Sequence, residues 1–169
     1  MLKIALFGRG KLGKQILALA PNHKVEVTDT SSADILIDAT GPEIVLNNIR
    51  FALELKKPIV VATTGWYDQL DYVQQLVKDK DGFCLYSPNF SPLVQNLLHL
   101  LPKLQLDGYT VCIEETHHLE KRDAPSGTAL ALASALGGVP IASYRKGDVI
   151  GNHRILIENR YERLTLEHE

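Results

Sequence analysis

The densest group of reactive side chains in the 169-residue sequence lies between Glu115 and Thr128. Two adjacent histidines, His117 and His118, are followed by Lys121. An imidazole titrates near neutral pH, and an imidazole or an ammonium group can protonate an atom next to one that has just received a hydride. The spacing therefore predicts acid–base chemistry at His117 and Lys121, and His118 and Lys121 also offer positive charge to a carboxylate.

Two other interpretations of this loop stay open. The histidines and Glu115 could bind a metal ion, but adjacent residues of a strand point to opposite faces, and no third ligand stands at a suitable spacing. The loop could also be a charged hairpin that faces water. The residues that follow favour chemistry, because Pro125 and a capping Ser126 predict a helix start whose N–H groups at Gly127 and Thr128 can bind a carboxylate. We therefore expect a small dianionic substrate and no metal.

A glycine loop near the N-terminus is the second candidate site. It consists of Gly8, Arg9, Gly10, Lys11, Leu12 and Gly13. The spacing G-x-G-x-x-G follows a strand-like run and opens a helix-like run, which is the context in which such loops bind the pyrophosphate of a dinucleotide. We therefore expect a nicotinamide dinucleotide at this loop.

Asp29 bears on the choice of cofactor. It follows the second strand-like run, where a carboxylate accepts hydrogen bonds from the adenine ribose and repels a 2′-phosphate. This favours NADH, although Arg9 and Lys11 could reach a 2′-phosphate, so that NADPH stays open. The alternative role for Asp29 is to start a turn.

Strand-like and helix-like segments alternate over the first half of the chain, which is typical of a parallel sheet with helices on its faces. The predicted strands are 2–7, 24–28, 33–39, 58–63 and 82–87, and the predicted helices are 11–19, 42–55 and 68–78. Nucleotides bind at the carboxyl ends of such strands, where Thr40, Thr63 and Thr64 offer small polar side chains. Ordinary turn chemistry is the alternative role for these threonines.

The pattern changes after residue 91. The predicted elements are a helix at 93–104, a strand at 109–115, a loop at 117–125, a helix at 126–136, and strands at 149–157 and 161–167. We therefore predict an α/β chain with a Rossmann-type doubly wound parallel sheet in residues 1–91. Residues 92–169 should form a smaller α+β lobe for substrate binding and oligomerisation, incomplete at its C-terminus because no turn or cap follows the last strand.

Composition excludes several classes of partner. A net charge of −2 offers no surface for nucleic acid, and no stretch approaches the roughly 20 apolar residues of a membrane span. The apolar run before the glycine loop is too short for a secretion signal. The two cysteines, Cys84 and Cys112, lack the spacing of a zinc or dithiol site. These features predict a cytoplasmic protein with reduced thiols.

The run from His117 to Ala129, HHLEKRDAPSGTA, closely resembles the H-H-x-x-K-x-D-A-P-S-G-T-A signature of dihydrodipicolinate reductases. The resemblance also covers the glycine loop, Asp38 to Pro42, Thr63 to Gly65 and Asn89 to Ser91, in the family's order. It implies reduction of 4-hydroxy-tetrahydrodipicolinate with NADH or NADPH in lysine and diaminopimelate biosynthesis. It further implies a cytoplasmic homotetramer.

The same resemblance implies a role for each matching residue. His117 would donate or accept a proton, and Lys121 would be the second proton donor. The substrate carboxylates would be bound by His118, Gly127 and Thr128. The dinucleotide would be lined by the loop from Gly8 to Gly13 and by Asp29, Ala62, Thr63, Thr64, Ser87, Pro88, Asn89 and Phe90.

Three features depart from the family pattern. The glycine loop is one residue shorter than G-x-x-G-x-x-G, and Pro92 to Gln95 replace a usual glycine and asparagine. Family chains also continue beyond the strand that matches residues 160–169, with an arginine-bearing stretch and a final helix. The alternative function is therefore a nucleotide-binding protein of the same fold that lacks reductase activity. The loop after His117 disfavours another Rossmann imine reductase, such as an amino acid dehydrogenase.

Overall fold

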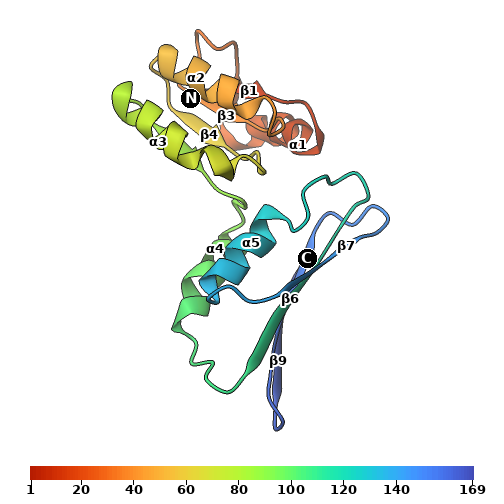
Figure 1. The fold of residues 1–169 in the computed structure, drawn as a ribbon. Coiled ribbons are helices and arrows are strands. Elements are labelled where there is room, and N and C mark those ends of the chain that lie inside the picture. Colours follow the sequence, from red (N-terminus) through yellow and green to blue (C-terminus); the bar gives the residue numbers. More distant parts are fainter. The chain divides into compact units, whose positions relative to one another are not determined.

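The structure is a computed structural model that describes all residues from 1 to 169. The chain forms two compact units, Met1–Pro88 and Asn89–Glu169 (Figure 1). Each unit has its own sheet and its own apolar core. The predicted boundary after residue 91 lies three residues beyond the end of the first unit at residue 88.

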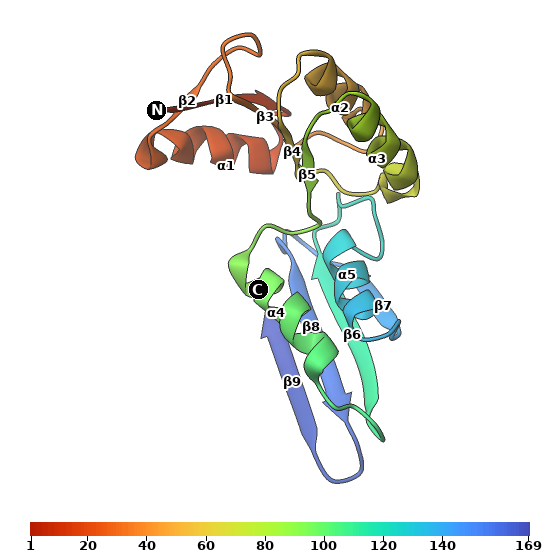
Figure 2. The ribbon, with the colours of Figure 1, turned by 90° about the vertical axis from the view of Figure 1, so that its left-hand side faces the viewer.

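The first unit is a five-stranded, all-parallel sheet in the order β2-β1-β3-β4-β5. Its strands are β1 (Leu2–Phe7), β2 (Val25–Val27), β3 (Ile35–Asp38), β4 (Ile59–Val61) and β5 (Cys84–Tyr86). Its helices are α1 (Lys11–Leu19), α2 (Val45–Glu54) and α3 (Leu70–Asp79), with 3₁₀ turns η1 (Ala20–His23) and η2 (Tyr67–Gln69). The strand order reverses between β1 and β3, so right-handed crossovers place α1 on one face and α2 with α3 on the other (Figure 2). This confirms the doubly wound sheet.

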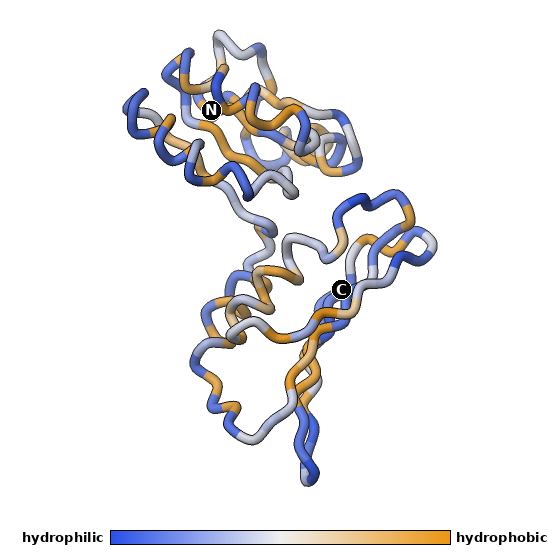
Figure 3. The backbone as a smooth tube through the Cα atoms, in the orientation of Figure 1, coloured by the Kyte–Doolittle hydropathy of each residue, from blue (hydrophilic) through white to orange (hydrophobic).

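The core of the first unit explains why these segments fold as they do. Ile59 and Val61 of β4 are fully buried, and α2 buries Val45, Ile49 and Ala52. The spacing of four and three residues in α2 makes one apolar stripe that faces the sheet. Figure 3 shows the hydrophobic residues concentrated on the strands and the hydrophilic ones on the outer turns.

Two predicted helices are corrected at their ends. The helix predicted from Pro42 begins at Val45, because the N–H groups of Ile44 and Val45 bond to the Gly41 carbonyl at 3.0 and 3.1 Å and close a turn first. The helix predicted over 93–104 ends earlier as an α-helix. Pro102 has no N–H to continue the ladder, so a 3₁₀ turn replaces its last part.

The second unit packs two helices on one face of a mixed sheet (Figure 2). Its elements are α4 (Pro92–Leu100), η3 (Leu101–Lys103), β6 (Thr110–His117), α5 (Gly127–Ala135), β7 (Ile141–Arg145), β8 (Asn152–Glu158) and β9 (Arg163–His168). The sheet order is β7-β6-β8-β9, with β7 parallel to β6 and the other pairs antiparallel. Leu101, Ile113, Leu132 and Ile155 are buried between helices and sheet. The α+β lobe is therefore confirmed.

The sequence prediction missed β7. Ile141 is the one large aliphatic residue of this segment, and the three residues after it are exposed. The segment therefore lacks the alternation of apolar and polar side chains by which a strand is recognised in a sequence. β7 is a strand because it pairs with the edge of β6 along its whole length.

The register of β6 positions the candidate site. Ile113, Glu115 and His117 alternate along the strand and are all buried on the face that the helices cover. Glu115 stands opposite His153 of β8, and His117 stands opposite Arg145 of β7. The end of β6 therefore carries polar side chains on the same face as the apolar core.

Candidate active site

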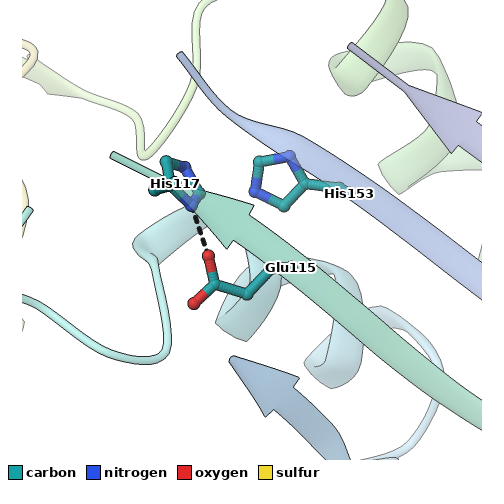
Figure 4. A group of neighbouring side chains, drawn as sticks. All are labelled: Glu115, His117 and His153. Atoms are coloured by element: carbon teal, nitrogen blue, oxygen red, sulfur yellow. Dashed lines mark hydrogen bonds and ion pairs between the residues drawn. The ribbon is translucent and has the colours of Figure 1, made fainter. Parts of the chain in front are cut away.

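His117 and Glu115 form the centre of the site in the second unit. Glu115 is fully buried and His117 is 7% exposed. The Nδ1 atom of His117 is hydrogen-bonded to one carboxylate oxygen of Glu115 (Figure 4). The other oxygen of Glu115 accepts a hydrogen bond of 2.9 Å from the Arg145 guanidinium, and the Ser143 hydroxyl also donates to this carboxylate. Both oxygens of a buried carboxylate are thus satisfied by protein donors.

The surroundings keep Glu115 ionised. Burial raises its pKa, but the hydrogen bonds from Ser143 and Arg145, together with His117, outweigh burial, so the pKa is lowered. An ionised carboxylate only accepts hydrogen bonds, so the Nδ1 atom of His117 carries the hydrogen. The Nε2 atom of His117 is then the nitrogen that gains or loses a proton.

His117 is neutral at pH 7. Burial lowers its pKa, the Glu115 charge raises it, and the positive charges of Lys121 and Arg145 lower it further. The net result is a lowered pKa, so the resting imidazole can accept a proton at Nε2. The negative charge of Glu115 then stabilises the imidazolium that results.

His153 is a third histidine of this site, which the sequence analysis missed. Its ring stands edge to face against the ring of His117, with 5.1 Å between centroids (Figure 4). Its Nε2 atom lies 3.1 Å from the Ser126 hydroxyl, and its buried Nδ1 atom has no partner. Burial, and then the positive charge that His117 carries when it is protonated, lower the pKa of His153 to about 4, so His153 is neutral at pH 7. The signal available in the sequence was a histidine two residues before Ile155 and Ile157, the aliphatic residues at the other buried positions of β8.

These three residues also bear on the metal interpretation. Glu115, His117 and His153 can each offer one ligand atom, with all such atoms within 4.8 Å of one another. The third ligand that the sequence spacing lacked is therefore present in the fold. However, the Arg145 guanidinium already forms an ion pair with the Glu115 carboxylate, and its positive charge would repel a cation bound beside it. We interpret the group as a hydrogen-bonded proton site, and the absence of a metal stays a prediction.

The loop after β6 holds Lys121 close to this group. Lys121 forms an ion pair with Asp123 at 2.7 Å, and its side chain is only 19% exposed. Arg145 donates hydrogen bonds to the backbone carbonyls of Lys121, at 3.3 Å, and of Asp123. His117 and Lys121 are thus not the water-facing side chains of a solvated hairpin.

The start of α5 lies beside the histidines. Ser126 caps this helix as predicted, because its hydroxyl accepts from the Ala129 N–H at 3.2 Å, and the same hydroxyl contacts His153. Gly127 and Thr128 are buried in the first turn of α5, where the helix dipole presents positive potential. His118 is partly buried, and its Nδ1 atom has no hydrogen-bond partner.

The glycine loop of the first unit has the geometry that its three glycines predict. Gly8 has φ +98°, and a Cβ there would meet the Ala39 carbonyl oxygen at 2.1 Å. A Cβ on Gly13 would lie 2.2 Å from the Gly8 oxygen, so the helix packs closely on the loop. A Cβ on Gly10 would meet nothing within 4 Å. The backbone of Gly10, the N-cap of α1, therefore faces open space, and its contact with a pyrophosphate stays a prediction.

Asp29 starts a turn in the structure. Its carboxylate accepts hydrogen bonds from the backbone N–H groups of Ser31 and Ser32, at 2.8 and 2.9 Å, and from both serine hydroxyls. These bonds, led by the Ser31 hydroxyl, lower its pKa to about 2. Asp29 is exposed and negatively charged, so the ribose contact stays a prediction beside its turn role.

Asp38 organises the strand ends of the first sheet. It is fully buried and accepts hydrogen bonds from the hydroxyls of Thr40 and Thr63 and from the Asn48 amide. The Ala62 N–H donates to the Asp38 carbonyl at 2.8 Å. Thr40 and Thr63 therefore belong to a hydrogen-bond network that supports the strand ends. The signal for this network in the sequence was Asp38, an acidic residue in an otherwise aliphatic strand.

The other predicted cofactor contacts divide between the two units. Thr64, Ser87 and Pro88 belong to the first unit, where they follow the strand ends of β4 and β5. Asn89 and Phe90 belong to the second unit. The Asn89 amide donates to the Thr128 hydroxyl at 3.2 Å, so this residue braces the start of α5.

A doubly wound sheet with a dinucleotide loop, and a second unit with a buried acid–base pair, define a nicotinamide-dependent oxidoreductase. Two family models match nearly the whole chain: the N-terminus of dihydrodipicolinate reductase over residues 22–90 and its C-terminus over residues 91–169. The chain belongs to the dihydrodipicolinate reductase family.

Individual relatives agree with this assignment. A 4-hydroxy-tetrahydrodipicolinate reductase of Christiangramia forsetii is 32% identical, with 99% of this chain and 84% of that protein covered. The enzyme of the same name from Pseudomonas fluorescens is 35% identical, with 80% of this chain and 61% of that protein covered. A dipicolinate-bound dihydrodipicolinate reductase from Paenisporosarcina sp. TG-14 has the same fold, with a TM-score of 0.70, 23% identity, and coverage of 100% of this chain and 88% of that one.

Proposed function

We propose that this chain reduces 4-hydroxy-tetrahydrodipicolinate to tetrahydrodipicolinate with NADH or NADPH, as a step of lysine and diaminopimelate biosynthesis. The observation that carries the proposal is the grouping of His117, its buried partner Glu115, Lys121 and the start of α5 in one site. The names of the relatives and the dipicolinate bound to the structural relative support the same substrate class.

The substrate carries two carboxylates on one ring. We assign them to Lys121 and His118 on one side and to the first-turn N–H groups of Gly127 and Thr128 on the other. Positive charge and a helix N-terminus both stabilise a carboxylate. With both ends held, the ring is presented to the Nε2 atom of His117.

The residues of the site then handle the protons. Loss of water requires a base for the departing proton and an acid for the hydroxyl group, and the neutral His117 and the cationic Lys121 fit these roles. When bound, the nicotinamide would supply the hydride for the electron-poor ring carbon. His117, now an imidazolium stabilised by Glu115, returns the proton to the neighbouring atom.

The cofactor contacts follow from the first unit. The loop from Gly8 to Gly13 and the start of α1 would hold the pyrophosphate, and Asp29 would favour NADH. The nicotinamide half would be lined by Ala62, Thr63, Thr64, Ser87, Pro88, Asn89 and Phe90. We further propose a cytoplasmic homotetramer, as the resemblance to the family implies. No helix of the chain has the length and apolar character needed to cross a membrane.

The test is a turnover assay on purified protein. The oxidation of NADH and NADPH is followed with substrate generated in place by the preceding synthase, for the chain itself, His117→Gln and Lys121→Met. His99→Gln and Lys103→Met, at exposed positions of α4 and η3, are the matched controls. We expect each site variant to lose about 10²–10⁴-fold in kcat/KM and the controls to keep full activity. A chain that binds NADH without turnover would establish the nucleotide-binding alternative instead.

A further inference from the structure

We propose that Glu115 and Arg145 are positioning residues that set up both proton donors, an inference that rests on the proposed function. Glu115 fixes which nitrogen of His117 exchanges the proton. Arg145 fixes Glu115 and the Lys121 loop at the same time. Neither residue belongs to the run from His117 to Ala129.

The contacts of Arg145 carry the first step. One terminal nitrogen of its guanidinium donates to Glu115 at 2.9 Å. Its Nε atom donates to the Lys121 carbonyl at 3.3 Å, and its other terminal nitrogen donates to the Asp123 carbonyl. One rigid group therefore connects the carboxylate behind His117 with the backbone on both sides of residue 122.

The geometry suits arginine alone among the cationic residues. A guanidinium presents five N–H donors in a fixed planar fork, whereas an ammonium group presents its donors from one point. Lysine at position 145 could keep a positive charge near Glu115 but could not reach three acceptors in three directions. The loop that carries Lys121 would then lose its anchor.

The second step concerns the charge around His117. The groups that face it are Glu115 on its own strand, Arg145 on β7, His153 on β8 and Lys121 on the following loop. Asp123 pairs with Lys121, and His168 of β9 lies behind His153 with 6.3 Å between ring centroids. Glu115 is the group among these that favours the imidazolium and bonds directly to its ring.

Glu115→Gln tests this arrangement because the substitution keeps the shape of the side chain. Arg145 can only donate hydrogen bonds, so the amide oxygen must face Arg145 and the amide NH₂ must face His117. The Nδ1 atom of His117 then becomes an acceptor, and its hydrogen moves to Nε2. The neutral ring can no longer accept a proton on the reactive side.

The first readout is independent of turnover. Nitrogen NMR of histidine-labelled protein distinguishes the two imidazole tautomers and follows their titration, and His117→Gln assigns the signal. We expect the Nδ1–H tautomer in the natural chain and in Glu115→Asp, which keeps the charge. We expect the Nε2–H tautomer and a lower pKa of His117 in Glu115→Gln. An Nδ1–H tautomer in Glu115→Gln, or an Nε2–H tautomer in Glu115→Asp, overturns the role of Glu115.

The second readout is kinetic. We expect Glu115→Gln to lower kcat by about 10²–10⁴-fold with a smaller change in KM, and to move the His117 limb of the pH profile to lower pH. Arg145→Lys should keep the Nδ1–H tautomer but lower kcat/KM by about tenfold or more. Wild-type kcat/KM in Arg145→Lys overturns the role of Arg145.

The matched control is Glu114→Gln, the same substitution one residue earlier on the opposite face of the strand. Glu114 forms a partly exposed ion pair with Arg154 at 3.5 Å, so we expect kcat/KM within about twofold of the natural chain. If the natural chain shows no turnover, the proposed function fails while the tautomer experiment still decides the role of Glu115.

Discussion

Gly151→Ala probes the space beside the reactive nitrogen of His117. A Cβ on Gly151 would lie 2.9 Å from the Nε2 atom and 3.2 Å from the Cδ2 atom of His117, whereas ordinary contacts begin at 3.4 Å. The φ angle of Gly151 is not in the left-handed region, so the backbone accepts alanine. The methyl group would therefore act on the histidine ring and on the space that a substrate needs.

The size of the effect follows from how the ring is held. The Nδ1 atom of His117 is hydrogen-bonded to Glu115, and the ring packs against the ring of His153. To make room for the new methyl group, the His117 ring must therefore rotate away from its preferred angle. Such a rotation costs about 0.5–1.5 kcal/mol, and misplacing a reacting group by about 1 Å can cost about 10²-fold in rate. We expect kcat/KM to fall by about 10- to 100-fold while the chain stays folded.

The assay is steady-state oxidation of the reduced nicotinamide, with thermal unfolding as the check on folding. Ile150→Ala is the control, because Ile150 is 89% exposed and adjacent in sequence. The control should keep both activity and melting temperature. A kcat/KM of Gly151→Ala within about twofold of the natural chain would show that the substrate does not approach the Nε2 atom of His117 through this space.

Three further predictions concern charge. Lys121→Met should raise the pKa of His117, because the lysine charge disfavours the imidazolium; an NMR titration that finds the pKa unchanged or lower would contradict this. Asp29→Ser should shift the ratio of kcat/KM for NADPH over NADH upward by about tenfold, since a carboxylate repels a 2′-phosphate; an unchanged ratio would leave Asp29 with its turn role only. His153→Gln should flatten the pH dependence of stability. The pKa of His153 is 6.5 in the unfolded chain and about 4 in the folded one, so the natural protein should lose up to about 3 kcal/mol of unfolding free energy as pH falls from 6.5 to 4. Urea unfolding across this range measures it, and equal slopes in both proteins would refute the assignment.

Local signals predicted much of the fold. The strand 2–7 and the helix 11–19 agree with β1 and α1, because an apolar strand, a glycine loop and an amphipathic helix are each visible within a few residues. Ser126 was predicted as a helix cap from its place before a small-residue helix, and the structure shows the capping bond. These features depend on neighbours in sequence, which a single sequence displays.

Distant pairing determines the rest of the site. His153 and Arg145 reach His117 only because β8 and β7 pair with opposite edges of β6. The residues next to positions 145 and 153 do not show which strands pair. The sequence therefore predicted reactive side chains only in the segment from His117 to Thr128. The turn at Asp29 was accessible, because its partners Ser31 and Ser32 follow within three residues.

One strand carries both the core and the proton site, since Ile113, Glu115 and His117 share a face of β6. Because side chains alternate with a period of two, a slip of β6 by one residue would turn the acid–base pair outward and expose the core side chain together with it. The register in which β6 pairs with its neighbours therefore determines both the packing of the core and the orientation of the acid–base pair. A chain in which β6 pairs in the wrong register would therefore lose its packed core and its acid–base pair together.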